Sequence, residues 1–75
     1  MINVTFGNNL TRSSELVNPN TTIRTFCEEN MPNYASATIT LDGSALRPGD
    51  IDKTFADFGI TERCYLLSIV KQDNA

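Results

Sequence analysis

Apolar and polar side chains alternate at the start of the chain. Ile2, Val4 and Phe6 are separated by polar residues, and this period of two predicts a half-buried β-strand. Residues 7–9, Gly-Asn-Asn, tolerate positive φ and therefore predict a turn. A returning strand is expected over residues 12–17.

This second strand fits the alternating pattern less well. Ser13 and Glu15 share a face with Val17, so either that face is exposed at a sheet edge or the register differs. Pro19 ends the strand, because proline has no N–H to donate to a ladder.

The next segment has the apolar period of a helix. Thr21 or Thr22 can cap it with a hydroxyl, and Pro32 ends it. The apolar stripe consists of Ile23, Phe26, Cys27 and Asn30 or Met31. A helix of about ten residues must be held by packing rather than by intrinsic propensity.

The second half of the chain predicts further strands joined by tight turns. Residues 37–41 are rich in β-branched side chains, and Asp42-Gly43 predicts a hairpin into a short strand over 44–46. Pro48 and Gly49 occupy the central positions of a type II turn. Asp50 can then cap a short helix that runs to Phe55.

The last strand, Cys64–Val70, is the most apolar run in the chain and should therefore be central. The element order is strand, strand, helix, strand, short strand, short helix, strand. It predicts one α+β domain over residues 1–75, in which a mixed sheet of four to five strands packs on one helix. The last strand should lie beside the first, which is the β-grasp arrangement.

Several segments resemble ubiquitin in order and spacing. They are the direct opening into a strand at Met1–Val4, the proline-containing lead-in to a threonine-capped helix at 18–23, the glycine hairpin at 41–46, and residues 53–60. In the last of these, Phe55 and Phe58 stand where that family has Leu and Tyr. The chain is thus similar over nearly its whole length to the ubiquitin-like family, and the resemblance implies the β-grasp roll.

The tail departs from the family pattern. Ubiquitin and the sulfur carriers act through a C-terminal diglycine, where this chain has Gln72, Asp73, Asn74 and Ala75. The resemblance therefore implies a protein–protein interaction module that is not conjugated, with an unidentified protein partner. The alternative is a truncated or atypically processed modifier or sulfur carrier, which the intact mass of the native protein would test.

Composition argues against other function classes. The net charge is -3 and the six basic residues are scattered, which disfavours nucleic acid and anionic membranes. No stretch is long and apolar enough for a membrane span, and no signal segment opens the chain, so we expect a cytoplasmic protein. No histidine can serve as a base, and we expect neither an enzyme nor a cofactor.

Neither the cysteines nor the aspartates point to a reactive site. We interpret Cys27 and Cys64 as small buried hydrophobes, although a disulfide between them is an alternative. Asp50 and Asp52 lack the further spaced oxygens of a calcium loop, so turn roles are favoured over a metal site.

The candidate partner site lies on the last strand. Tyr65, Leu67 and Ile69 form its bulkier face, which we expect to pack against the helix. This leaves Leu66 and Val70 on the open face of the sheet, beside Thr38 or Thr40 of a neighbouring strand. Such a patch resembles the small apolar surface by which ubiquitin is recognised. We expect a monomer; the alternative is a homodimer that pairs through the polar second strand.

Overall fold

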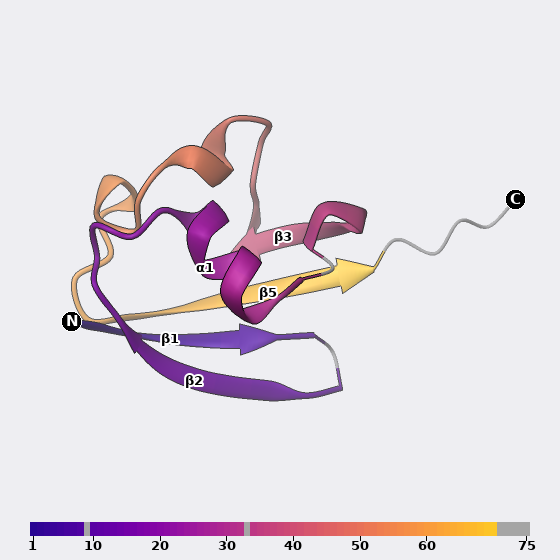
Figure 1. Cartoon of the computed structure of the whole chain (residues 1–75), viewed down its shortest axis with the longest axis horizontal. Coiled ribbons are helices and arrows are strands. Elements are labelled where there is room, and N and C mark those ends of the chain that lie inside the picture. The colour runs from indigo at the N-terminus through magenta and orange to yellow at the C-terminus, as the bar shows by residue number, and fades with distance from the viewer. Residues whose placement is uncertain (9, 33, 71–75) are drawn as a thin grey trace, which may run out of the picture.

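The computed structural model describes residues 1–8, 10–32 and 34–70, except for the side chain of Val70. Five strands form one mixed sheet in the order β2-β1-β5-β3-β4 (Figure 1). Their bounds are β1 Ile2–Gly7, β2 Arg12–Val17, β3 Ala37–Leu41, β4 Ser44–Ala45 and β5 Arg63–Val70. The most apolar strand, β5, is central: it pairs parallel with β1 and antiparallel with β3. The predicted β-grasp topology is confirmed.

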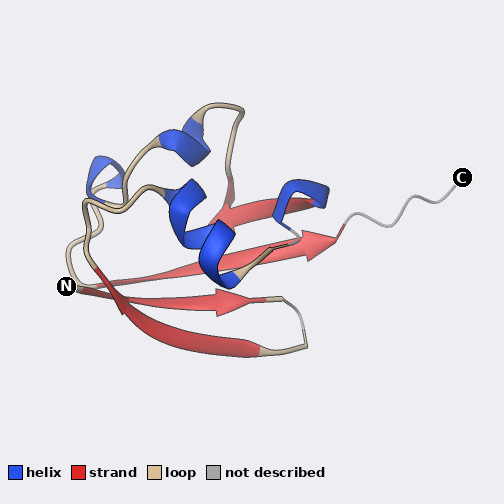
Figure 2. Cartoon of the chain, in the orientation of Figure 1, coloured by secondary structure: helices blue, strands red, loops and turns tan. Residues whose placement is uncertain are grey.

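The one α-helix among the described residues, α1, spans Ile23–Asn30 and is capped as the sequence predicts (Figure 2). The hydroxyl of Thr22 accepts the backbone N–H of Thr25 at 3.1 Å, and the helix ends at Met31. Its buried residues are Ile23, Phe26 and Cys27. Because the helix is only about two turns long, this buried stripe is what holds it in place.

Two turns have the geometry that their residues predict. Asp42 and Gly43 have φ values of 51° and 88°, which is the type I′ geometry of a tight hairpin between β3 and β4. The carboxylate of Asp42 also accepts the N–H of Tyr65 at 2.9 Å, so the turn is tied to β5. In the next turn the N–H of Asp50 donates to the carbonyl of Arg47, with a positive φ at the intervening glycine, as in type II.

The predicted short helix from Asp50 to Phe55 is wrong. Two separate 3₁₀ turns are present, η2 at Asp50–Asp52 and η3 at Ala56–Phe58. Between them the backbone is extended at Lys53 and is bonded to the start of α1: the carbonyl of Lys53 accepts the N–H of Ile23, and the N–H of Phe55 donates to the carbonyl of Thr21. These bonds interrupt the helical backbone at Lys53 and hold the buried Phe55 against the core.

Aromatic rings form the centre of the core between α1 and the sheet. Phe26 makes edge-to-face contacts with Phe6 and Phe55, at centroid distances of 5.1 and 5.7 Å. Cys27 and Cys64 are both free and buried, as the interpretation of small hydrophobes requires. Burial raises the pKa of each thiol to about 11. Both thiols are therefore protonated and unreactive at neutral pH.

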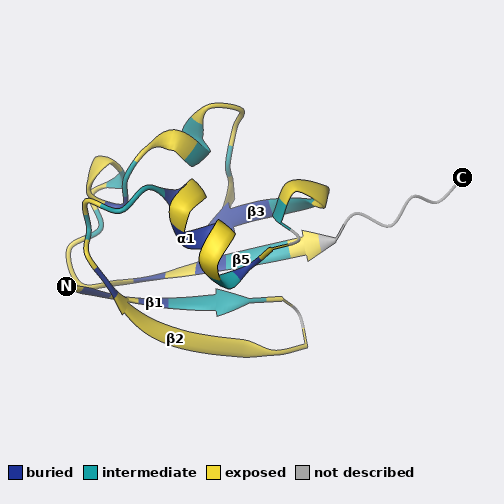
Figure 3. Cartoon of the chain, viewed as in Figure 1, coloured by how far each residue is buried: buried dark blue, intermediate teal, exposed yellow. Residues whose placement is uncertain are grey.

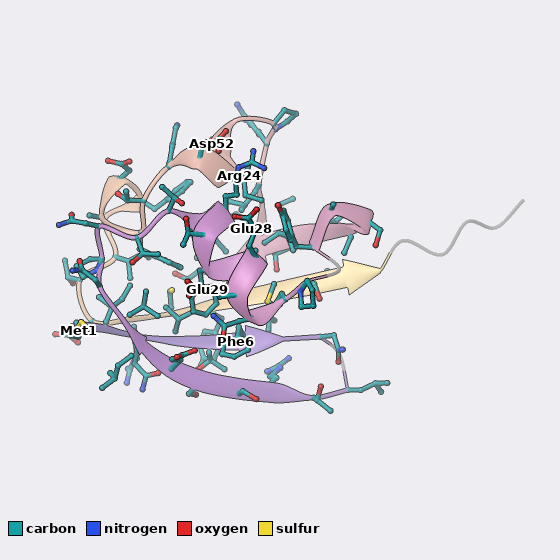
Figure 4. All side chains as sticks on the ribbon, viewed as in Figure 1. Met1, Phe6, Arg24, Glu28, Glu29 and Asp52 are labelled. Carbon is teal, nitrogen blue, oxygen red and sulfur yellow. The ribbon has the colours of Figure 1, made fainter. Side chains whose placement is uncertain are left out.

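Three aspartates hold the irregular segment between β4 and β5 by accepting hydrogen bonds. The Thr54 N–H donates to Asp57 and lowers the pKa of that carboxyl below its usual 3.8. The backbone N–H of Arg47 does the same for Asp50, and the guanidinium of Arg24 does so for Asp52. Figure 4 shows Arg24 and Asp52 meeting between α1 and η2, with the Nε–Oδ1 distance at 2.6 Å.

These shifts predict loss of stability in acid. Because each folded-state pKa lies below the unfolded value of 3.8, the stabilisation is fully present above about pH 5 and is lost as the pH falls through the folded-state values. Urea unfolding at pH 3 and pH 7 should show a lower midpoint at pH 3. Asp57→Asn should reduce this difference. An unchanged pH dependence in Asp57→Asn would show that the Thr54–Asp57 hydrogen bonds contribute nothing to it.

Candidate protein-binding face

Strand pairing defines which side chains share the open face of the sheet, the face away from α1. Directly opposed residues of neighbouring strands point to the same side. Tyr65 is opposed to Thr5 of β1, Leu67 to Thr40 of β3, and Ile69 to Thr38 of β3. The intervening residues of β5 face the core, and Figure 3 shows the resulting alternation of exposed and buried positions along β5.

The predicted facing of the last strand is wrong. Leu66 has no exposed surface, and Cys64 is 2% exposed, so this set of side chains packs beneath α1. Leu66 is opposed to Phe6 and Leu41, both on the core side of their strands. Tyr65 and Ile69 point outward instead, with 51% and 43% of their surfaces exposed. Leu66 cannot contact a partner while the chain is folded.

Of the other predicted site residues, the structure places Thr38 and Thr40 on the open face. They stand beside Ile69 and Leu67 rather than beside Leu66. Thr38 is half-buried, whereas Thr40 is only 9% exposed and its hydroxyl lies 3.5 Å from the carbonyl of Leu67. The prediction for Val70 concerns a side chain outside the described part of the structure.

The structure therefore places a different set of apolar side chains on the open face. We call Tyr65, Leu67 and Ile69 the open-face patch. The sequence-based prediction buried Tyr65, Leu67 and Ile69 because they are the bulkier set. The structure instead buries the set that contains the small side chain of Cys64. The hydroxyl of Tyr65 favours the exposed face, since a buried tyrosine hydroxyl needs a hydrogen-bond partner in the protein and an exposed one can bond to water.

Two further leucines, one on β2 and one in the loop before it, are exposed. Leu16 of β2 is 65% exposed and lies on the open face, two strands from β5. Leu10 is 91% exposed in the loop between β1 and β2. The Asn8 carboxamide oxygen accepts the N–H groups of Leu10 and Thr11 at 2.7 and 2.9 Å, and these bonds hold the backbone of Leu10 next to Asn8.

The charges on the open face are mainly positive. Arg63 of β5 is opposed to Asn3, and Arg12 of β2 is opposed to Gly7, so both arginines share the face of the patch.

Glu15 faces the other side, opposite the core residue Val4, and is exposed because β2 is an edge strand. Of the two explanations offered for the polar residues of the second strand, an exposed sheet edge is therefore the right one, and a different register is not needed.

The described residues contain no grouping that suggests another chemistry. No three His, Cys, Asp or Glu side chains among them converge as metal ligands. None of the helices in the described part of the chain has the length and apolar character needed to cross a membrane. Every buried side-chain N or O atom found there has a hydrogen-bond partner, so none is left aimed at a missing ligand.

Comparison with solved structures places the fold. The chain superposes on a ubiquitin of Caldiarchaeum subterraneum with a TM-score of 0.72 and 15% identity, covering 99% of this chain and 98% of that one. A ubiquitin-like domain from Arabidopsis thaliana gives a TM-score of 0.72 at 20% identity, covering 99% and 81%. The ubiquitin-like domain of Plasmodium falciparum Dsk2 gives 0.61 at 18%, covering 89% and 96%. No protein-family model and no curated protein matches the sequence.

Proposed function

We propose that this chain, which has the ubiquitin-like β-grasp fold, is a non-conjugated interaction module that binds a protein through the open-face patch. One observation carries the proposal: Tyr65 and Ile69, two large apolar side chains, are about half exposed on the central strand. Strands β1 and β3 flank β5 and fix the backbone positions of these two residues. A partner therefore meets a preorganised surface, and little conformational freedom of this chain is lost on binding.

The chemistry of the face suggests the chemistry of its partner. Tyrosine and arginine are among the residue types most enriched at binding hot spots, and apolar side chains at the centre with charges at the rim are typical of interfaces. Here Tyr65 and Ile69 provide the centre, and Arg12 and Arg63 provide positive charge on the same face. A partner with an apolar centre and an acidic rim would fit this surface.

The buried thiols support a binding role over a catalytic one. The chain has no histidine, and burial raises the pKa of both Cys27 and Cys64 to about 11. Neither sulfur is in the thiolate form that nucleophilic chemistry needs, and neither is accessible to a substrate.

The decisive test is to place a charge in the patch without touching the core. Ile69→Asp should retain the fold, because the side chain is 43% exposed, and should weaken partner binding by about 30-fold or more, as for a hot-spot residue. Partners captured from native lysate with the wild-type chain would be identified by mass spectrometry, and their affinities for the variants measured by calorimetry.

The matched control places the same charge elsewhere. Ala56→Asp introduces an aspartate at an exposed position of η3, outside the sheet, and should leave affinity unchanged. A partner that binds folded Ile69→Asp as tightly as wild type would refute the open-face site. Equal weakening by both variants would indicate a net-charge effect instead.

A further inference from the structure

A second surface lies on the opposite edge of the sheet from β2. It is a groove of about 430 Å³ between the outer edge of β3, the first turn of α1 and the segment that leads into η2. Its lining residues are Arg24, Tyr34, Ala35, Ala37, Thr38, Ile39, Leu46, Arg47, Pro48 and Ile51. A volume of this size accommodates one large side chain of a bound segment.

The groove exists because β4 is too short to cover β3. β4 pairs only with Thr40 and Leu41, and the N–H of Leu46 adds one more bond to the carbonyl of Ile39. The N-terminal half of β3 therefore has no strand on its outer side. Because Asp42 pairs with Tyr65 of β5, the alternation of the ladder turns the carbonyl of Ala37 outward, toward the groove.

The floor of the groove is apolar and incompletely covered. Tyr34, Leu46 and Ile51 pack against the core cluster yet remain only partly buried. They come from three separate segments, the 3₁₀ turn at Tyr34–Ser36, the end of the β4 hairpin and η2, which converge on this site. An apolar side chain placed here would remove part of all three from water.

The charged groups that line the groove are both cations. Arg24 and Arg47 face it, and no carboxylate is among its described lining residues. Asp52 binds Arg24 through Nε and Nη2, at 2.6 and 3.3 Å, and a further hydrogen bond joins the guanidinium to Tyr34, so Arg24 is held in place and its charge is paired. Arg47 lies near Asp50, whose carboxylate accepts its backbone N–H, but its guanidinium is in neither of the salt bridges found among the described residues, so Arg47 is the cation that the groove offers to an incoming ligand.

We propose that this groove binds an extended acidic peptide segment of a partner protein. One large apolar side chain of the segment occupies the floor formed by Tyr34, Leu46 and Ile51, and a neighbouring carboxylate pairs with the guanidinium of Arg47. A backbone N–H of the segment donates to the outward carbonyl of Ala37. The groove adjoins the open face at Thr38 but contains none of the three residues of the open-face patch, which would let the module hold two proteins at once.

The test uses a defined probe, the capped peptide Asp-Glu-Phe-Leu-Asp-Glu, and its neutral counterpart Asn-Gln-Phe-Leu-Asn-Gln. In ¹H–¹⁵N NMR titration, the acidic probe should shift the amides of Ala37, Ile39 and Leu46, with a Kd of about 0.1–1 mM, a range common for short isolated segments. The neutral probe should bind at least about tenfold more weakly, and salt should weaken only the acidic one.

Charge reversals then locate the binding site. Arg47→Glu should weaken the acidic probe at least about tenfold, and Arg47→Gln should weaken it less, since it removes the attraction without adding repulsion. Arg63→Glu makes the same charge change on the open face and should have little effect. The proposal is overturned by absence of binding at several millimolar probe, by shifts confined to Tyr65, Leu67 and Ile69, or by equal weakening from Arg63→Glu. Shifts confined to those three residues would instead place the acidic probe on the open-face patch, whereas the other two outcomes would leave the open-face proposal unaffected.

Discussion

Replacing Leu66 with aspartate should unfold the protein at neutral pH. Leu66 has no exposed surface and lies at the centre of the sheet, opposed to Phe6 and Leu41. Truncating a buried leucine costs about 2–5 kcal/mol, and an unpaired carboxylate in the same place costs several more. A domain of this length has about 4–11 kcal/mol of total stability, so the loss exceeds or consumes what is available.

The neighbouring residue supplies the control. Tyr65→Asp places the same charge one position away, on the open face where Tyr65 is 51% exposed, and should stay folded. Circular dichroism and the dispersion of the ¹H–¹⁵N spectrum would report the fold of each variant. Leu66→Ala should remain folded, with a free energy of unfolding lower by about 3 kcal/mol. A folded Leu66→Asp with an unfolded Tyr65→Asp would mean that β5 faces the other way.

Much of the fold was predictable because local signals and the global topology agree. The alternation of Ile2, Val4 and Phe6, the Thr22 cap and the Asp42-Gly43 turn each specify an element without reference to distant residues. The apolar run over 64–70 specified the central strand. These signals depend on short-range geometry, which a sequence carries directly.

The failures involve contacts between distant segments. The extended stretch between η2 and η3 follows from hydrogen bonds that Lys53 and Phe55 make to the start of α1, and no local pattern encodes them. The facing of β5 likewise depends on its register with β1 and β3. Since β5 is apolar on both faces, composition could not decide which set of its side chains is buried. The residues assigned to the candidate site were therefore taken from the wrong face of β5.

The open face of the sheet was therefore predicted as the candidate surface, but the apolar side chains on it were not. Thr38 and Thr40 were assigned to the correct face because β3 has polar residues on one side and Ile39 and Leu41 on the other. The groove beside β3 had no sequence signal. Its residues come from α1, the 3₁₀ turn after it and the β4–η2 segment, and only the folded chain brings them together.

Gly7→Ala should produce the second large effect, through the backbone rather than the core. Gly7 closes β1 at φ +145°, and a Cβ built on it would lie 2.1 Å from the carbonyl oxygen of Thr11 and 2.9 Å from the Cα of Arg12. Both are backbone atoms, of the residue before β2 and of its first residue, so no side-chain rotation can relieve the clash. The β1–β2 turn must open, and with it the hydrogen bond from Asn8 to Thr11.

Gly59→Ala is the control for Gly7→Ala, because it measures the cost of a positive φ without a steric clash. Gly59 has φ +77°, and no atom lies within 4 Å of the place that a Cβ would take, so alanine there should cost about 1 kcal/mol of conformational strain. Gly7→Ala should cost about 3 kcal/mol or more, which lowers the Tm by roughly 15 °C in a domain of this size. Thermal unfolding of both variants measures the difference. Equal losses would mean that the hairpin accommodates the methyl group, and that glycine at position 7 serves only its backbone angle.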